Sequence, residues 1–210
     1  MNTEALLPAL GTTFLITITA IFSGLVLGAL IAVIRESNTI WSKLAKLYVD
    51  GLRSMPLAIV LLLFFMTIPN LINTLLKVNL DSRLMTAMIA FSMFESAYFS
   101  EIMRNGLKSI SRNQYDAAKT LGMNKIQIYR LIILPQAFKK MIPVFITQSV
   151  VLFQDTSLVY MIGLADFFTT AKTVGENSGE LTKYLLIAGV FYFSVSLLFS
   201  TLSTIISKKA

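Results

Sequence analysis

The sequence contains no cysteine and no histidine. Without cysteine the chain can form no disulfide, no thiolate metal site and no thiol nucleophile, and without histidine imidazole chemistry is excluded as well. Charged residues are also scarce, at 14%, against about a quarter in a typical soluble domain, whereas hydrophobic residues make up 55%. This composition leaves few groups for acid–base catalysis and indicates a chain that lies mostly within a membrane.

Three stretches, at residues 5–34, 54–76 and 184–207, carry no charge and are each long enough to cross about 30 Å of hydrocarbon as a helix. Two further apolar stretches contain acids, Glu95 and Glu101 in one and Asp155 in the other. A soluble all-α core would need polar faces that these runs lack. We therefore predict an all-α integral membrane protein, one domain over residues 1–210, whose five transmembrane helices lie at about 10–34, 44–76, 83–109, 137–164 and 182–207.

The charges are distributed unevenly between the two sides of the predicted bundle. Residues 104–140 hold eight basic residues and one acid, Asp116. Further bases on the same side are Arg35, Lys43, Lys46, Arg53, Lys208 and Lys209, whereas the opposite loops hold Lys77, Arg83, Lys172 and Lys183 with Glu4, Asp81, Asp166, Glu176 and Glu180. Because basic residues accumulate in cytoplasmic loops, we expect the N-terminus outside and the C-terminus inside. This topology accounts for the net charge of +7, so no nucleic-acid partner is expected.

Glu4 stands where a signal peptide would carry basic residues, and the apolar run that follows is too long for a signal core. We therefore expect no cleavable signal.

The large basic loop shows the signals of two short helices. Asn113 is the predicted N-cap of the first helix, with Asp116 three residues later in a capping-box-like position. Gly122 can adopt the positive φ that ends a helix, and Asn124 can cap the next helix. Pro135 is expected to force a new start for the helix that enters the membrane.

The same loop carries a longer pattern: an acid, two alanines, three residues, glycine, nine residues, and then I-x-L-P. This pattern resembles the EAA loop of ABC-importer permeases, with aspartate in place of glutamate. The resemblance implies the type I ABC-importer permease fold and a cytoplasmic coupling helix that docks into the ATPase, within a coupling loop at about 111–135. It assigns this ATPase coupling to Asp116, Ala117, Ala118, Gly122, Ile132, Leu134 and Pro135.

The resemblance extends over nearly the whole chain. The five spans, the loop before the fourth span and the run Arg53-Ser54-Met55-Pro56 are similar to those of polar amino-acid permeases, and residues 91–102 and 151–168 look most like the glutamate/aspartate permease subunit. The implied function is that of a permease subunit in an ATP-driven importer of the bacterial inner membrane. Alternatives are a permease for glutamine, arginine, lysine or histidine, and, from other classes, a membrane scaffold subunit or a membrane enzyme.

The resemblance also implies partners. These are a second permease subunit, identical or different, a dimer of cytoplasmic ABC ATPases, an extracytoplasmic amino-acid-binding protein and the lipid bilayer. The chain has no GxxxxGK[ST] motif, so ATP and Mg are expected on the partner ATPase, and no cofactor and no metal are expected on this chain.

Polar residues inside the predicted spans are candidates for the substrate pathway: Glu95, Gln148, Gln154, Asp155, Thr156 and Ser157. An acid at mid-bilayer costs about 2.5–3.5 kcal/mol, so such residues should face protein or water. Glu95 and Asp155 are candidates for the α-ammonium group of an amino acid, and the amides and hydroxyls for its carboxylates. By helical rise the two acids differ by about 10 Å in depth, and one ligand need not touch both. The alternative is that these polar groups hold the helices together by hydrogen bonds.

Two further expectations concern the packing of the helices. Arg53 and Glu101 both lie about 10 Å inside the cytoplasmic boundary by helical rise, which predicts a structural ion pair between the second and third spans. The alternative is that Glu101 pairs with Arg104 in its own helix. Gly24 and Gly28 are spaced for close helix approach, and Pro56 predicts a bend in the second span.

Overall fold

The computed structural model describes residues 3–76 and 82–209. Lys77 and Asp81, which contribute to the predicted charge of the outer side, lie outside the described residues, as do the side chains of Lys208 and Lys209. Within the described part every regular element is helical, which confirms the all-α class. The elements are η1 (Thr3–Ala5), α1 (Leu6–Arg35), α2 (Ile40–Ser54), α3 (Leu57–Leu76), α4 (Arg83–Lys108), α5 (Arg112–Thr120), α6 (Lys125–Ile128), the π-helical η2 (Tyr129–Ile133), α7 (Leu134–Asp155), the 3-10 helix η3 (Thr156–Ile162), α8 (Phe167–Ser178) and α9 (Leu181–Lys209).

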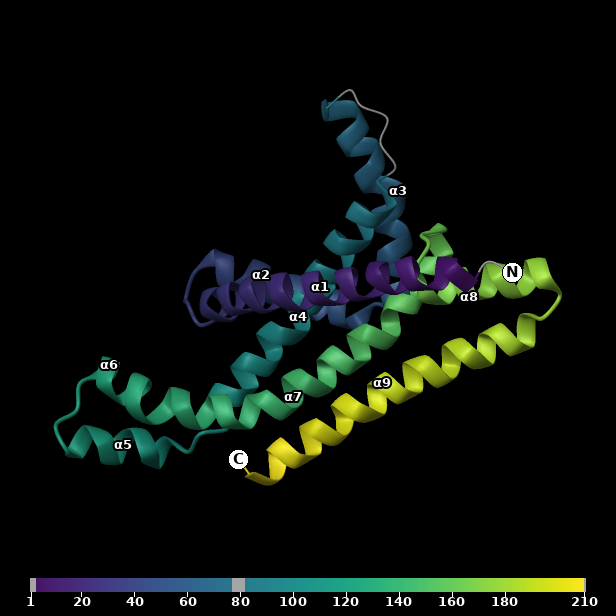
Figure 1. Ribbon diagram of the computed structural model, residues 1–210. Helices are drawn as coiled ribbons and strands as arrows, with labels where there is room; N and C mark the ends of the chain where they lie inside the picture. Colours follow the sequence, from purple (N-terminus) through teal and green to yellow (C-terminus); the bar gives the residue numbers. More distant parts are fainter. Residues whose placement is uncertain (1–2, 77–81, 210) are drawn as a thin grey trace.

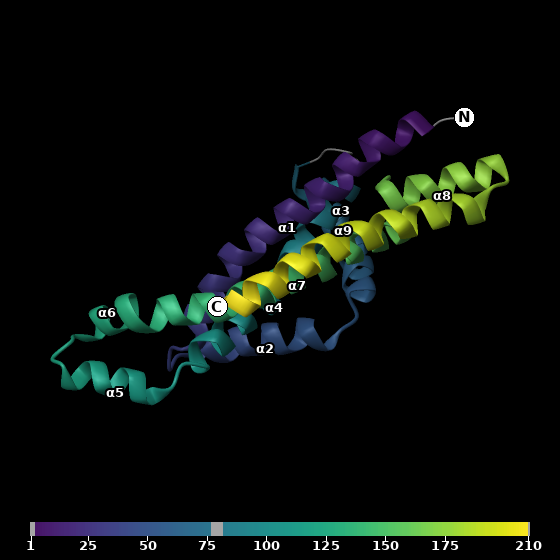
Figure 2. The same cartoon turned by 60° about the horizontal axis from the view of Figure 1, so that its bottom comes forward.

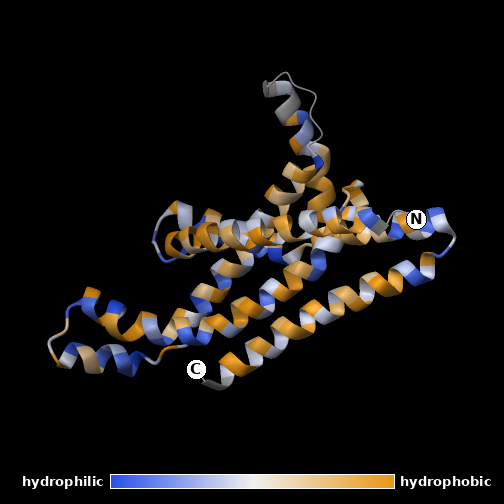
Figure 3. Cartoon of the chain, in the orientation of Figure 1, coloured by the Kyte–Doolittle hydropathy of each residue, from blue (hydrophilic) through white to orange (hydrophobic). Residues whose placement is uncertain are grey.

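The described residues contain three helices that are both long and apolar enough to cross a membrane: α1, the helical run Lys125–Ile162, and Leu181–Ser207 within α9. The pair α2–α3 becomes a fourth if its two bent halves are counted together. The helix α4 is long enough, at 26 residues, but it is less apolar because it carries Glu95, Glu101 and several serines. Figure 3 shows the contrast between the mostly apolar α1 and α9 and the polar tip of α5 and α6.

The second predicted span is two helices, so the expectation of one helix over 44–76 was wrong. The helices α2 and α3 meet at an angle of 112°. Met55 between them has an extended backbone (φ −104°, ψ 142°), as expected for a residue that precedes proline, and Pro56 cannot donate a backbone hydrogen bond. The bend that Pro56 predicted is therefore confirmed, and it is sharper than a kink within one helix (Figure 2).

The most extensive contact between two helices is that of α1 with α4, which cross near the centre of the molecule (Figure 1). A Cβ atom on Gly24 would lie 3.0 Å from the Cβ of Glu95, and one on Gly28 would lie 3.0 Å from the carbonyl oxygen of Ser96. The close approach predicted from these two glycines is confirmed. On the α4 side, Ala87, Ala90 and Ala97 are fully buried in the same core.

The segment before α9, whose charged residues were assigned to an outer loop, contains the helix α8. The buried Asp166 side chain caps α8, accepting a hydrogen bond of 2.8 Å from the backbone of Thr169 and one of 3.2 Å from the Tyr192 hydroxyl of α9. The Thr13 hydroxyl of α1 accepts a bond of 3.0 Å from the backbone of Phe167. Burial raises the pKa of Asp166 above its usual range, although the hydrogen bond that its carboxylate accepts from Thr169 lowers the pKa in part. The hydrogen bonds of Asp166 and Thr13 therefore hold α8 against α1 and α9.

A buried ionic cluster joins α1, α2 and α4 around Glu101. Arg35 of α1 approaches the Glu101 carboxylate to 2.6 Å, and Arg104 hydrogen-bonds its other oxygen. The predicted ion pair of Glu101 with Arg53 of α2 is confirmed, at 3.8 Å, a distance within the range of an ion pair but too long for a hydrogen bond. The pairing with Arg104 that was considered as the alternative is present as well. Arg35 is the partner that sequence reasoning missed, because it was counted only as a charge at the membrane boundary.

We predict that Arg35→Gln lowers the stability of the purified protein by about 1–3 kcal/mol, because it removes the 2.6 Å partner of a carboxylate whose side chain is only 11% exposed. Arg53→Gln, the matched control in the same cluster, should cost clearly less because its contact is longer. Melting temperatures of both variants and a double-mutant cycle of Arg35 with Glu101 provide the measurement. Additive losses in that cycle, or equal losses for the two arginines, would contradict the assignment.

Candidate functional site

The coupling loop projects from one end of the molecule as a hairpin of α5 and α6 (Figures 1 and 2). The N-cap of α5 is Ser111, whose hydroxyl accepts a hydrogen bond from the backbone of Asn113 at 3.3 Å, so the prediction of Asn113 as the cap was wrong. The helix therefore begins two residues earlier than expected. Asp116 lies in its second turn, exposed to solvent, and takes no part in the cap.

The turn between the two helices has the predicted geometry. Gly122 has φ of +81°, and the backbone of Met123 donates to the carbonyl of Ala118 at 3.2 Å, which closes the end of α5. Asn124 caps α6, and its side chain and that of Gln127 each accept a hydrogen bond from the other residue's backbone, at 3.0 and 2.9 Å. Both predictions, the positive φ and the Asn124 cap, are confirmed.

A small hydrophobic core holds the hairpin closed. Its buried members are Ala118, Ile128 and Ile133, and Ile132 is among the half-buried residues packed against them. Ala117 is exposed, as are the apolar side chains of Leu121 and Ile126, at 82% and 76%. The alanine pair of the motif is thus divided between the hairpin core and its surface.

The helix that follows Pro135 does not start anew, so that expectation was wrong. Helical structure continues from α6 through η2 into α7, and Leu134 and Pro135 are the first two residues of α7. Proline removes one backbone donor, and its ring crowds the carbonyl four residues earlier. The π-helical turn directly before Leu134 widens the backbone there, and the chain passes the proline without a break.

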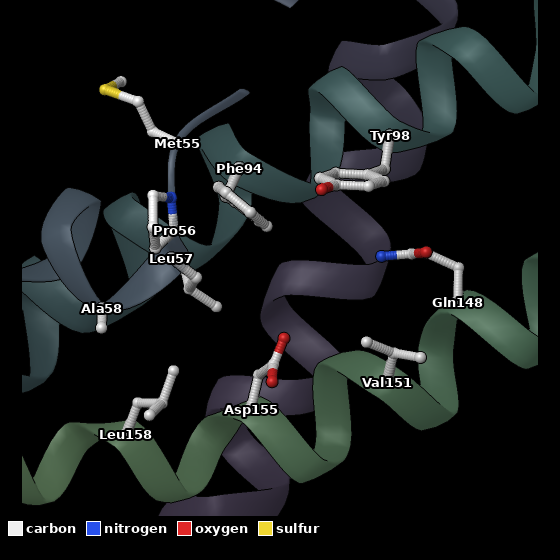
Figure 4. A pocket seen from close by; sticks show the side chains of 10 residues that line it. All are labelled: Met55, Pro56, Leu57, Ala58, Phe94, Tyr98, Gln148, Val151, Asp155 and Leu158. Atoms are coloured by element: carbon white, nitrogen blue, oxygen red, sulfur yellow. The ribbon is translucent and has the colours of Figure 1, made fainter. Parts of the chain in front are cut away.

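A cavity of about 350 Å³ lies between the α2–α3 break, α4, α7 and the start of η3. Figure 4 shows its walls, with Tyr98 on α4 and Gln148 and Asp155 on α7. Its lining residues are Met55, Pro56, Leu57, Ala58, Phe94, Tyr98, Gln148, Val151, Asp155 and Leu158. The bend at Pro56 therefore contributes one side of the cavity directly.

Two of the predicted pathway residues, Gln148 and Asp155, line the cavity. In the part of the chain that the structure describes, no hydrogen bond or ion pair holds the Asp155 carboxylate. Glu95 is fully buried and lies behind Gln148, whose amide nitrogen is 3.2 Å from each of its carboxylate oxygens. The two acids therefore do not face the cavity together, and Gln148 separates Glu95 from it.

The other three candidates point elsewhere. The amide of Gln154 donates to Ser196 of α9 at 3.0 Å. The buried Thr156 hydroxyl donates to the carbonyl of Phe153, and the Ser157 hydroxyl to that of Gln154. These contacts match the alternative in which intramembrane polar groups hydrogen-bond within the protein. The wall residues on the bend and on α4 were not predicted, although the Arg53-x-x-Pro56 run marked the right place.

Comparison with known proteins identifies the family. Residues 24–210 match the family described as "Binding-protein-dependent transport system inner membrane component". The chain belongs to this family. It is 48% identical to the glutamate/aspartate import permease protein GltK of Escherichia coli O6:H1, with 97% of this chain and 92% of the relative covered. It is 30% identical to the probable glutamine ABC transporter permease protein GlnP of Bacillus subtilis (strain 168), over 92% of this chain and 86% of that protein.

Solved structures agree with this membership. A crystal structure of an amino acid ABC transporter with histidines contains a chain that is 26% identical and superposes with a TM-score of 0.88, covering 99% of this chain and 95% of that one. A chain of the MetNI methionine ABC transporter, at 15% identity and a TM-score of 0.73 over 97% of both chains, shares the fold. The predicted family is therefore confirmed, and the chain is an inner-membrane component of a transport system.

Proposed function

We propose that this chain is the permease subunit of an ATP-driven importer for glutamate and aspartate, which receives its substrate from an extracytoplasmic binding protein. The observation that carries this proposal is the 48% identity to a glutamate/aspartate import permease over nearly the whole chain. Identity falls to 30% for the probable glutamine permease and 28% for the arginine permease ArtQ of Bacillus subtilis (strain 168).

The cavity beside the α2–α3 bend is the proposed substrate site. Its volume of about 350 Å³ lies within the range of small-molecule pockets, and its wall is mostly apolar with a few polar groups. Asp155 is the proposed partner of the substrate's α-ammonium group. A carboxylate inside a membrane protein needs a cation or water to offset its desolvation, and a passing ammonium group meets that need.

The coupling function is proposed for the α5–α6 hairpin, which would dock into a cleft of the partner ATPase. Asp116, Ala117, Leu121 and Ile126 are exposed on it and are available for contact. Ala118 and Ile132 keep its two arms together, and Leu134 and Pro135 begin the helix that leads on to Asp155. Movement of the ATPases would then reach the cavity through a single helical run, Lys125–Ile162.

In the proposed assembly two permease subunits combine with two ATPases in a bacterial inner membrane. The five spans of this chain would be α1, the broken α2–α3, α4, α7 together with η3, and α9. The N-terminus and α8 lie at one end of the molecule and the α5–α6 hairpin at the other, which supports an outer N-terminus and a cytoplasmic hairpin (Figure 1).

The test of this function is ATP-driven uptake by the complex reconstituted in vesicles with its ATPase and binding protein. Labelled glutamate, aspartate, glutamine and arginine are offered in parallel. Uptake of glutamate and aspartate above the other two is the expected result. Preference for glutamine or arginine would indicate a permease for another polar amino acid, and failure to associate with an ATPase would favour a scaffold role.

We predict that Gly122→Val leaves membrane insertion intact but uncouples ATP hydrolysis from transport. At φ of +81° a side chain with a Cβ strains the turn by roughly 1 kcal/mol or more and tilts the docking surface. Gly179→Val is the matched control, because Gly179 has a similar φ of +70° and equally open surroundings but lies at the end of α8. Normal uptake with Gly122→Val, or equal loss with both variants, would argue against the coupling role.

We also predict that Asp155→Asn preserves assembly and basal ATPase activity but weakens amino-acid binding at the cavity about tenfold, because it removes a charge-assisted hydrogen bond. Asp50→Asn, at an exposed position on α2, is the control and should change nothing. Uptake and melting temperature are measured on the same preparations. Unchanged uptake would reject the ligand role, and a large fall in melting temperature would assign Asp155 to structure instead.

A further inference from the structure

Arg53 is the least engaged of the three arginines around Glu101. Arg35 and Arg104 both hydrogen-bond the Glu101 carboxylate, whereas Arg53 remains 3.8 Å from it. One carboxylate thus faces three guanidinium groups. Within the described residues Arg53 forms no ion pair with any other acid, including Asp50 three residues earlier on α2. Its side chain is 37% exposed, against 6% for Arg35 and 24% for Arg104.

Arg53 also lies beside the cavity. Its guanidinium carbon is 5.4 Å from the centre of the Tyr98 ring, and Tyr98 is one of the lining residues. Met55 and Pro56, two and three residues further along the chain, line the cavity as well. Tyr98 lines the same cavity as Asp155 (Figure 4), so Arg53 lies directly beside a residue of the cavity wall. A guanidinium group above an aromatic face keeps its N–H donors available at its edge.

The charge of the proposed substrate requires a cation. Glutamate and aspartate each carry one ammonium group and two carboxylates, so Asp155 can account for the ammonium group only. Among the residues that the structure describes, those that line the cavity include no lysine and no arginine. A carboxylate in such surroundings would be poorly solvated unless a strong donor lies nearby, and arginine binds carboxylates through two parallel hydrogen bonds.

We propose that Arg53 is a substrate-binding residue that takes a carboxylate of the acidic amino acid as it passes through the cavity. This inference rests on the proposed function. Arg35 and Arg104 keep Glu101 satisfied, which leaves Arg53 able to turn toward the cavity without exposing a buried charge. Arg53 then contributes the positive group, and Asp155 the negative group, for a ligand that carries both signs of charge.

The test measures equilibrium binding of labelled glutamate to the purified permease–ATPase complex without its binding protein. Three variants are compared with the wild type: Arg53→Gln, Arg53→Lys, and Lys46→Gln as a control that removes one exposed positive charge from the same helix. We expect Arg53→Gln to weaken binding at least tenfold, Arg53→Lys to recover part of it, and Lys46→Gln to stay within twofold. Melting temperatures should remain close to that of the wild type.

Competition by two amides shows which carboxylate is bound. Glutamine lacks the side-chain carboxylate and isoglutamine lacks the α-carboxylate. If Arg53 binds the side-chain carboxylate, the ratio of affinities for glutamate over glutamine should be smaller in Arg53→Gln than in the wild type. If it binds the α-carboxylate, the ratio for glutamate over isoglutamine should be smaller instead. Unchanged glutamate binding in Arg53→Gln, or weaker binding that merely follows a lower melting temperature, would overturn the proposal.

If the wild-type complex itself transports another amino acid, the proposed function fails. Binding of that amino acid to the same variants is then measured. Unchanged binding to Arg53→Gln would reject the substrate-binding role of Arg53, and weaker binding at an unchanged melting temperature would support it.

Discussion

The Glu101 carboxylate is the point at which α1, α2 and α4 are held together. A charge in the membrane interior costs about 2.5–3.5 kcal/mol, so Glu101 needs partners, and it finds them on three helical segments. Arg35 ties the end of α1 to α4, and Arg53, near the end of α2, makes the longer contact of 3.8 Å. Because α2 ends one residue after Arg53, this cluster lies directly before the turn at Pro56, which forms one wall of the cavity.

The interior of this protein is polar where a soluble protein would be apolar. The helix α4 buries Ser92, Ser96, Ser100, Glu95 and Glu101 at its contacts with the rest of the molecule. The exposed surface carries the apolar side chains instead, as on α9, where Leu186, Val190 and Phe193 are more than 60% exposed. Lipid is as apolar as these side chains, so helix packing relies on close contact and hydrogen bonds, which the approach at Gly24 and Gly28 permits.

Features that depend on neighbouring residues were predictable from the sequence. The positive φ of Gly122 and the Asn124 cap follow from the chemistry of those residues. The cap of α5 was placed at Asn113 because serine and asparagine cap helices about equally well, and only the fold selects Ser111. The helix α8 was missed because its threonines, glycine and acids resemble a loop, while its fixation by Asp166, Thr13 and Tyr192 comes from distant parts of the chain.

The candidate site was predictable only in part, for the same reason. Gln148 and Asp155 are two helical turns apart on α7 and could be assigned together. The burial of Glu95 behind Gln148, and the contact of Gln154 with Ser196, depend on which faces of α4, α7 and α9 meet. Periodicity cannot determine those faces when every helix is apolar on most sides. The Arg35–Glu101 contact joins residues 66 positions apart, and no local pattern marks it.

The continuous helical run from Lys125 to Ile162 has a mechanical consequence. Its 38 residues measure roughly 57 Å along the helical run at 1.5 Å per residue, with the Asn124 cap at one end and Asp155 near the other. A tilt of about 10° around one end would displace the opposite end by about 10 Å, a distance comparable to the width of a helix. In the proposed coupling this helical run would act as a lever arm, and the π-helical turn at Tyr129–Ile133 is a place along it where the regular α-helical hydrogen bonding is interrupted.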